Sequence, residues 1–180
     1  MSQDAHMLRN EAFFALIKEP NAANYRALYT LITQSPEYVP YTTELQTLRA
    51  LYQEKFYEDC LEKFKSMMPN WMLSPYAHQI ACLAAKHLGN MQMAQMEMHI
   101  AQSCSDGLLA SGDGSRERPF LVTHTEDERA ALDRLEKQSR QQALIQKDGR
   151  HLDCISCADG SVVWFDVTAL MVRQEALTRR

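Results

Sequence analysis

The sequence contains no apolar run of about 20 residues, the length that a helix needs to cross a bilayer. Its first residues, MSQDAHMLRNEAFF, carry Asp4 and Glu11 where a secretory leader would carry positive charge followed by an apolar run. The five cysteines are odd in number and fall mostly within apolar helical patterns, which favours a reducing compartment over a disulfide framework. We therefore expect a cytoplasmic protein with no leader and no membrane partner.

Concentrated positive charge is lacking as well. The chain has 19 basic and 23 acidic residues, for a net charge of -4, and neither half forms a basic patch. A nucleic-acid binder needs a concentrated positive field to release counterions from phosphates. We expect no nucleic-acid partner.

The short motifs that carry catalysis are also missing. No G-x-S-x-G and no H-E-x-x-H is present, and the six histidines are scattered along the chain. A catalytic triad assembled only by folding stays an alternative. The sequence favours a protein that is not an enzyme, and it predicts no catalytic residue, no metal ligand and no cofactor.

What the chain does have is helical periodicity. With 180 residues, 46% of them hydrophobic, it can bury a sizeable core. Up to about Ser103 the apolar residues recur at spacings of three and four, which places them on one stripe of a helix. Six helices are predicted, at about 4–18, 22–33, 42–53, 56–67, 75–88 and 91–103.

Two of the predicted helix pairs repeat each other. Sliding LRALYQEKFYEDCLEKFKSM forward by 34 residues places it on CLAAKHLGNMQMAQMEMHIA, and small or apolar positions coincide, such as Cys60 with Ala94 and Phe64 with Met98. This stretch, from about Tyr41 to Ser103, resembles the tetratricopeptide repeat. The helix pair before it keeps the layout with a slipped register, which we interpret as a degenerate capping repeat.

The resemblance implies a concave face lined by the first helix of each pair, where a protein or peptide partner binds. Arg49 and Lys86 would hold a carboxylate of the partner, while Tyr52 and Tyr76 would offer broad apolar contact with a polar tip. The alternative is that these are ordinary solvated helix positions. The implied lining consists of Leu45, Arg49, Tyr52, Gln53, Tyr76, Gln79, Leu83, Lys86 and His87.

The period changes after Gly114. PFLVTH predicts a short strand, and Thr125 with Glu128 three residues later predicts a capping box that opens a helix from Glu126 to about Gln138. QALIQ, HLDCIS and SVVWFDV then predict three strands joined by the hairpin turns KDG and ADG. A module this small buries little core alone, so we expect it to pack on the last helical repeat.

The stretch LLASGDGSRERPFLVTHTEDE joins the two regions. It lacks the alternating oxygen ligands of a calcium loop and the terminal Gly-Lys-Ser/Thr of a phosphate-binding loop, so we interpret it as a linker or tight turn. S-G-D-G, the strand and helix after it, and the final VVWFDV resemble the tail module of a family of uncharacterised bacterial proteins. The predicted organisation is a helical-repeat domain at 1–106, a linker at 107–118 and a small module at 119–180.

A second class of function rests on HLDCISC. Cys154 and Cys157 have C-x-x-C spacing and follow His151, so a small metal- or thiol-dependent enzyme or regulator is the alternative to an adaptor. On a strand, however, the odd separation sends the two thiols to opposite faces. A cluster of seven methionines between Met67 and Met98 is interpreted mainly as core filling, with a share exposed.

The sequence therefore predicts an α+β protein in which about six antiparallel, tetratricopeptide-like helices precede a β-α-β-β-β module. Its predicted function is that of a non-enzymatic bacterial adaptor that binds a protein or peptide on its concave helical face. The oligomeric state is left open.

Overall fold

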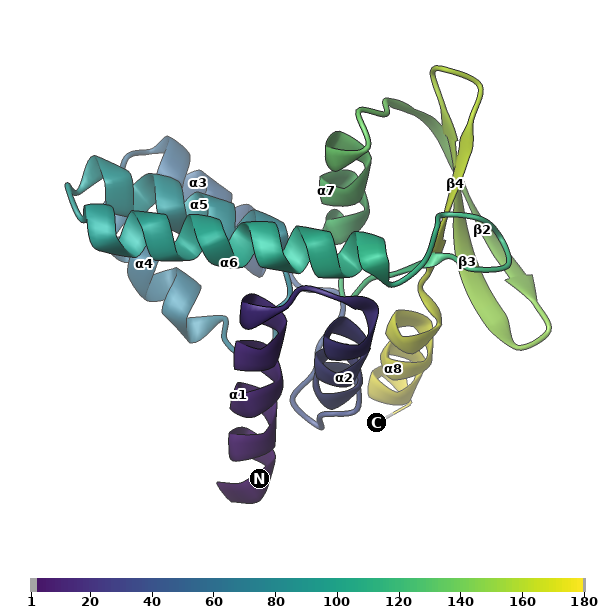
Figure 1. The fold of residues 1–180 in the computed structure, drawn as a ribbon, viewed down its shortest axis with the longest axis horizontal. Helices are drawn as coiled ribbons and strands as arrows, with labels where there is room; N and C mark the ends of the chain where they lie inside the picture. Colours follow the sequence, from purple (N-terminus) through teal and green to yellow (C-terminus); the bar gives the residue numbers. More distant parts are fainter. Residues whose placement is uncertain (1–2, 180) are drawn as a thin grey trace.

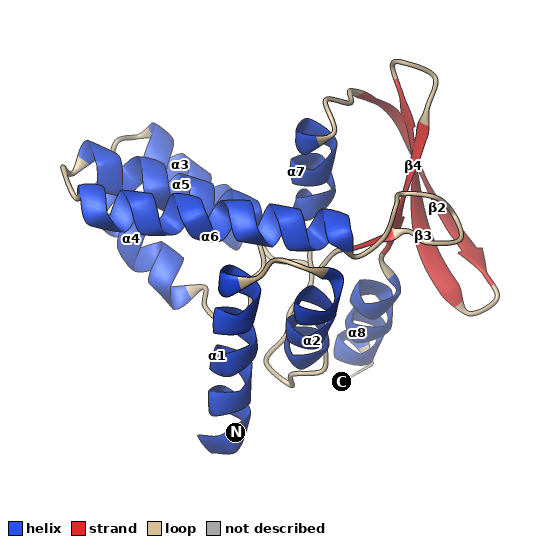
Figure 2. Cartoon of the chain, in the orientation of Figure 1, coloured by secondary structure: helices blue, strands red, loops and turns tan. Residues whose placement is uncertain are grey.

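The computed structural model of the chain describes residues 3–179 (Figure 1). Helices fill the N-terminal part and strands gather in the C-terminal part, which confirms the predicted α+β class (Figure 2). The elements are α1 (Gln3–Lys18), α2 (Ala22–Thr33), α3 (Glu44–Gln53), α4 (Tyr57–Ser66), α5 (Pro75–His87), α6 (Met91–Ala110), β1 (Phe120–Leu121), α7 (Glu126–Arg134), β2 (Ser139–Lys147), β3 (Arg150–Cys157), β4 (Val162–Asp166) and α8 (Thr168–Thr178).

The long helix α6 is the central element of the molecule, and other elements pack along its length. At one end α3, α4 and α5 form an arm, with α5 packed along α6 and α4 packed on both α3 and α5 (Figure 1). At the other end α1 and α2 pack across α6, and α7 and β1 contact it as well. Among the described helices, none is long and apolar enough to span a membrane.

The sheet contains four strands in the order β1-β4-β3-β2. β1 pairs with β4 in parallel, and the other two pairings are antiparallel. Asp148 and Gly149 both have positive φ, the conformation of a tight hairpin turn, and Gly160 has a φ of 83° in the second turn. The predicted Asp-Gly hairpins are confirmed.

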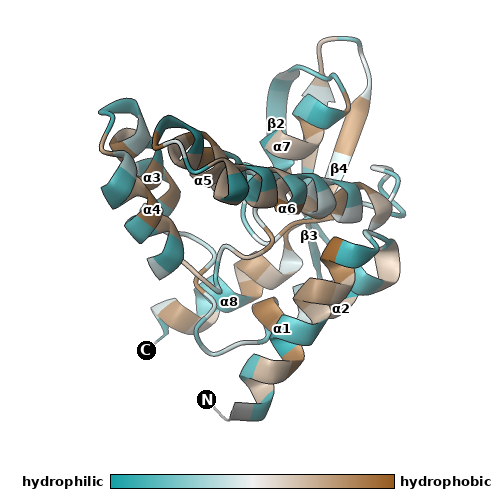
Figure 3. Cartoon of the chain, turned by 60° about the vertical axis from the view of Figure 1, so that its left-hand side comes forward, coloured by the Kyte–Doolittle hydropathy of each residue, from teal (hydrophilic) through white to brown (hydrophobic). Residues whose placement is uncertain are grey.

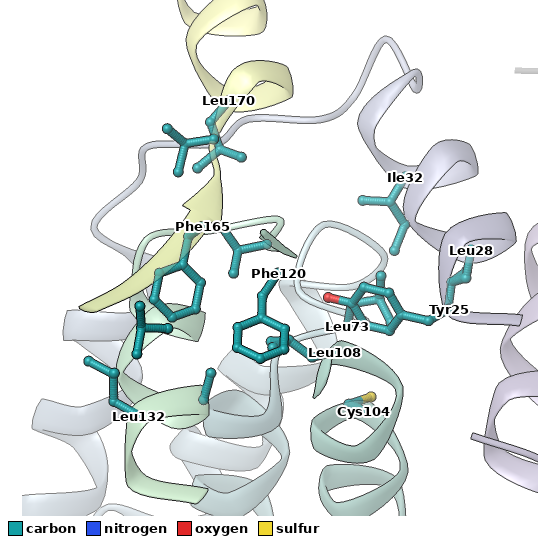
Figure 4. Close-up of a cluster of buried hydrophobic side chains, with 14 of the residues drawn as sticks. Tyr25, Leu28, Ile32, Leu73, Cys104, Leu108, Phe120, Leu132, Phe165 and Leu170 are labelled. Atoms are coloured by element: carbon teal, nitrogen blue, oxygen red, sulfur yellow. The ribbon is translucent and has the colours of Figure 1, made fainter. Parts of the chain in front are cut away.

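Two hydrophobic clusters hold the fold together. One lies inside the α3–α5 arm and the start of α6, and it includes Leu48, Phe64 and Trp71. The other joins α1, α2 and α6 to the sheet, α7 and α8, and Figure 4 shows Phe120 lying between Tyr25 and Phe165. The small module therefore packs on α6, as predicted, and on the first helix pair too.

Helix α6 continues to Ala110, although the sequence pattern predicted an end near Ser103. Gly107 lies within these additional residues. Its missing side chain makes room, because a Cβ there would lie 2.7 Å from Cδ1 of Leu16 and 2.9 Å from Cδ2 of Tyr25. This glycine permits close packing of α6 on α1 and α2 and does not end the helix.

The S-G-D-G turn is a tightly packed seam between α6 and the sheet. A Cβ on Gly112 would lie 2.4 Å from the carbonyl oxygens of both Arg118 and Pro119. Gly114 has a φ of 74°, and its carbonyl accepts a hydrogen bond from the backbone N–H of Trp164 at 3.0 Å. The prediction of a tight turn that uses the left-handed freedom of glycine is confirmed.

The predicted capping box is wrong. The hydroxyl of Thr125 makes no capping hydrogen bond to the backbone of α7, and the Glu128 side chain points into the protein and accepts from Gln142 at 3.1 Å. Asp127 takes the local capping role, because its carboxylate accepts from the backbone N–H of His124 at 3.2 Å. Helix α7 ends at Arg134, four residues before the predicted end, since Glu136 adopts a left-handed φ of 56°.

Helix α8 was not predicted, because its polar and apolar residues show no clear stripe. It packs on α2 and β3 and buries Leu170, and it can be followed below the sheet in Figure 3. The Arg173 guanidinium anchors it by donating to the carbonyl of Tyr38 at 2.8 Å. Helix α8 thus lies on the α2 side of the molecule.

Candidate partner-binding groove

A shallow groove of about 220 Å³ runs between α3 and α5, the first helices of the two predicted repeats. We call it the helical groove. Six of the nine residues that the 34-residue register implied lie in its lining, and Ile80 completes it. The lining consists of Arg49, Tyr52, Gln53, Tyr76, Gln79, Ile80 and Leu83.

Aromatic rings give the helical groove its shape. The Arg49 guanidinium lies 5.6 Å from the centre of the Tyr76 ring, so α3 and α5 meet through a cation–π contact. At the other end the His87 ring stacks on Tyr57 with centroids 4.4 Å apart, and the Tyr52 hydroxyl lies 3.4 Å from Nε2 of His87. These contacts hold the rings in place, which lowers the entropy cost of binding a partner.

The other three predicted residues lie outside the lining. Leu45 is 2% exposed and packs in the core of the arm, so its side chain is not part of the groove surface. Lys86 and His87 are exposed on the last turn of α5, beyond the end of the groove. Over residues 3–179, neither Arg49 nor Lys86 makes a salt bridge, so both positive charges are open to a partner.

Comparisons with protein-family models, with curated proteins and with solved structures found no match for this chain.

The C-x-x-C segment lies on β3, as predicted. Cys157 is buried, Cys154 is half-buried, and burial raises the pKa of the Cys154 thiol. His151 is buried beside α8, where its backbone N–H donates to the Thr168 hydroxyl at 3.0 Å. Within the described part of the chain, no group of three or more His, Cys, Asp or Glu residues is placed to hold a metal ion.

The methionine cluster is divided between core and surface. Met67 is 1% exposed and fills the core of the arm, which agrees with the predicted core filling. Met91, Met96 and Met98 are exposed on α6, at 50%, 53% and 38%.

A buried polar cluster at the start of α7 was not predicted from the sequence. The Asp127 carboxylate is fully buried and accepts from the Thr123 hydroxyl at 3.1 Å. The neighbouring His124 ring stacks on Trp71 with centroids 3.8 Å apart. Burial raises the pKa of Asp127 to about 7 and lowers the pKa of His124 to about 3. The cluster connects the arm to the C-terminal module through largely uncharged groups.

A second buried carboxyl lies one residue further along. Nε2 of Gln142 donates to Glu128 at 3.1 Å and to Asp153 at 2.7 Å. Burial, followed by the nearby charge of Asp153, raises the pKa of Glu128 to about 10. The helical spacing of α7 could have indicated that these two carboxyl groups are buried. Asp127 and Glu128 lie four residues before the buried Ala131 and Leu132, so they share the same stripe of the helix.

These shifts predict a loss of stability at high pH. The fold favours neutral Glu128, whereas the unfolded chain ionises it above its ordinary pKa of 4.5, so its contribution is lost as pH rises through about 10. Asp127 acts in the same direction between 3.8 and about 7. His124 acts in the opposite direction, because its contribution is lost only as pH falls from 6.5 through about 3.

We expect urea-unfolding free energies to fall between about pH 6.5 and about pH 9, and to fall less steeply for Glu128→Gln, which stays neutral and keeps a hydrogen-bonding amide. An equal slope in the variant and the wild type would show that Glu128 is ionised in the folded protein.

Proposed function

We propose that the chain is a non-enzymatic adaptor that binds a protein or peptide partner in the helical groove between α3 and α5. In this proposal α3–α6 act as two tetratricopeptide-like helix pairs, and the first helix of each pair supplies the contact surface. The partner carries a carboxylate that pairs with Arg49 or Lys86. It also presents an apolar side chain that packs between the rings of Tyr52 and Tyr76.

The observation that carries the proposal is that residues matched by the 34-residue repeat lie on the surface of the same groove. Residues 34 positions apart by the internal repeat, such as Arg49 and Leu83, line the same groove. The groove also has the composition of a binding surface, since Tyr and Arg are the residue types that contribute most at protein interfaces. The exposed Leu83, at 40%, supplies an apolar contact within it.

The test is a selection of short peptides from a displayed random library on the immobilised full chain, followed by affinity measurements on the Arg49→Glu/Lys86→Glu variant. Reversing two charges beside the helical groove is expected to weaken binding of the selected acidic peptides roughly tenfold or more. This corresponds to a loss of about 1.4 kcal/mol or more in binding free energy.

The matched control is Lys18→Glu/Lys65→Glu, which makes the same change in net charge at exposed positions on α1 and α4. Its affinity should stay within about twofold of the wild type, a difference of roughly 0.4 kcal/mol. Equal losses in both variants would reduce the effect to net charge, and a library that yields no binder would count directly against the adaptor function.

A further inference from the structure

Strand β2 is the open edge of the sheet, since the strand order places it last and, among the described residues, β3 alone pairs with it. Its nine residues are exposed except for the half-buried Ile145. Its interior, QQALIQ, is uncharged, and charges stand only towards the ends, at Arg140 and Lys147. Proteins usually protect such an edge with central charges, proline or a covering segment, because its unpaired backbone groups are a template for another strand.

A groove of about 690 Å³ lies between this edge strand and helix α7. We call it the strand groove. Gln142 and Ile155 are paired in the register of β2 and β3, so their side chains stand on the same face of the sheet, and both line the strand groove. Figure 1 shows α7 standing beside the sheet, with the chain crossing from the end of α7 to the start of β2. The strand groove therefore lies over one face of β2 and β3, beside the open edge, where side chains of a strand added to β2 would enter it.

The charge of the strand groove favours an acidic occupant. Arg129 on α7 and Arg140 on β2 both line it, and neither makes an ion pair with any residue between 3 and 179. Lys137 also lines it but is neutralised by Asp159 at 2.9 Å. Asp133 is the opposing charge in the lining.

Glu128 does not repel an acidic occupant. It lines the strand groove at 3% exposure, and its Oε1 has no hydrogen-bond partner in the described structure. Burial keeps its pKa near 10, so at neutral pH it is an uncharged carboxyl group.

A second copy of this chain fits the edge poorly. Two β2 strands aligned antiparallel over Arg140–Lys147 would place Arg140 of each copy opposite Lys147 of the other. Like charges directly opposite each other destabilise a strand pair. The occupant that complements this edge is therefore a different segment that carries carboxylates.

We propose that the open edge of β2 binds an extended acidic peptide segment as an additional strand, with carboxylates of that segment paired to Arg129 and Arg140. Backbone hydrogen bonds to β2 would provide affinity, and the two guanidinium groups would select for acidic side chains. This binding mode is independent of the helical groove, which lies on the arm at the other end of α6.

The test uses the full chain and three labelled peptides: an alternating Glu-Val peptide, the Lys-Val counterpart, and a Glu-Val copy that is N-methylated throughout. Fluorescence anisotropy would measure binding to the wild type, to Arg129→Glu/Arg140→Glu and to the control Lys18→Glu/Lys65→Glu. Both arginines are exposed, so we expect circular dichroism to show an intact fold. Hydrogen exchange would report protection of the β2 amides.

The Glu-Val peptide is expected to bind the wild type roughly tenfold or more tightly than either other peptide does. Its affinity should fall by a similar factor for the Arg129→Glu/Arg140→Glu variant and not for the control variant. Its binding should slow exchange at 140–147 and leave α3 and α5 unaffected, whereas a peptide that protects α3 and α5 instead would support only the helical groove. Equal binding of the N-methylated copy would overturn strand addition, and equal binding of the Lys-Val peptide would overturn the acidic preference. A chain that sediments as a dimer whose interface protects β2 would show that a second copy occupies the edge.

Discussion

Gly112→Ala is expected to lower the free energy of unfolding by about 3 kcal/mol or more, or to prevent folding. The new Cβ would lie 2.4 Å from the carbonyl oxygens of Arg118 and Pro119, and backbone oxygens cannot move aside as a flexible side chain can. Relief requires the S-G-D-G turn to open, and this turn joins α6 to the sheet. Urea unfolding followed by far-UV circular dichroism measures the loss.

Gly160→Ala is the matched control. Gly160 also lies in a turn and has a φ of 83°, but a Cβ there would meet nothing within 4 Å. The expected loss is about 1 to 2 kcal/mol, the cost of a left-handed conformation for a residue with a side chain. Losses of the same size at the two positions would mean that the close approach at Gly112 does not exist.

The second large effect is expected for Trp71→Ala, which should destabilise the chain by about 3 to 5 kcal/mol. Trp71 is fully buried, its Nε1 donates to the Glu44 carboxylate at 3.0 Å, and its ring stacks on His124. Removing the indole leaves a cavity where the arm meets α7. It also leaves the buried His124 without its stacking partner. Thermal and urea unfolding of the variant would both report this loss.

Trp164→Ala supplies the comparison for Trp71→Ala. Trp164 is half-buried on β4, where its ring lies 5.4 Å from the Arg116 guanidinium. Partial burial and one cation–π contact predict a loss of about 1 kcal/mol. A Trp164 variant as unstable as the Trp71 variant would contradict the central position that the structure gives to Trp71.

The sequence predicted the parts of the fold that local periodicity and turn chemistry decide. Five of the six N-terminal helices end within about two residues of their predicted ends, because Pro20, Pro36 and Gly89 act locally. The Asp-Gly turns likewise fixed both hairpins. The 34-residue register went further, because it grouped residues from α3 and α5 that line one groove.

The parts that failed depend on contacts distant in sequence. The sixth helix was predicted to end near Ser103, and the sequence did not show that Leu16 and Tyr25 pack against Gly107 in its last turns. Glu128 was predicted as a capping-box residue, and the sequence did not show that Gln142 and Asp153, on strands later in the sequence, lie beside it. The strand groove could not be predicted, because nothing in QQALIQ states that β2 lies at the edge of the sheet.

The exposed apolar side chains identify where further partners could be sought. Phe14 on α1 is 69% exposed, and Met96 on α6 is 53% exposed, while the helical groove combines Leu83 with two tyrosines and Arg49. The helical groove brings these apolar, aromatic and charged groups together in one hollow between two helices of the predicted repeats. For this reason the proposed function is assigned to the groove.

Site-specific photo-cross-linking tests that assignment most directly. A benzophenone amino acid would be placed at Gln53 or Gln79 in the helical groove, and at Lys18 on α1 as the control position. If the groove binds the partner, irradiation of cells that express the chain gives a discrete cross-linked species from the two groove positions, and Arg49→Glu/Lys86→Glu abolishes it. A cross-link that forms as readily from Lys18, or none from either groove position, would contradict the account.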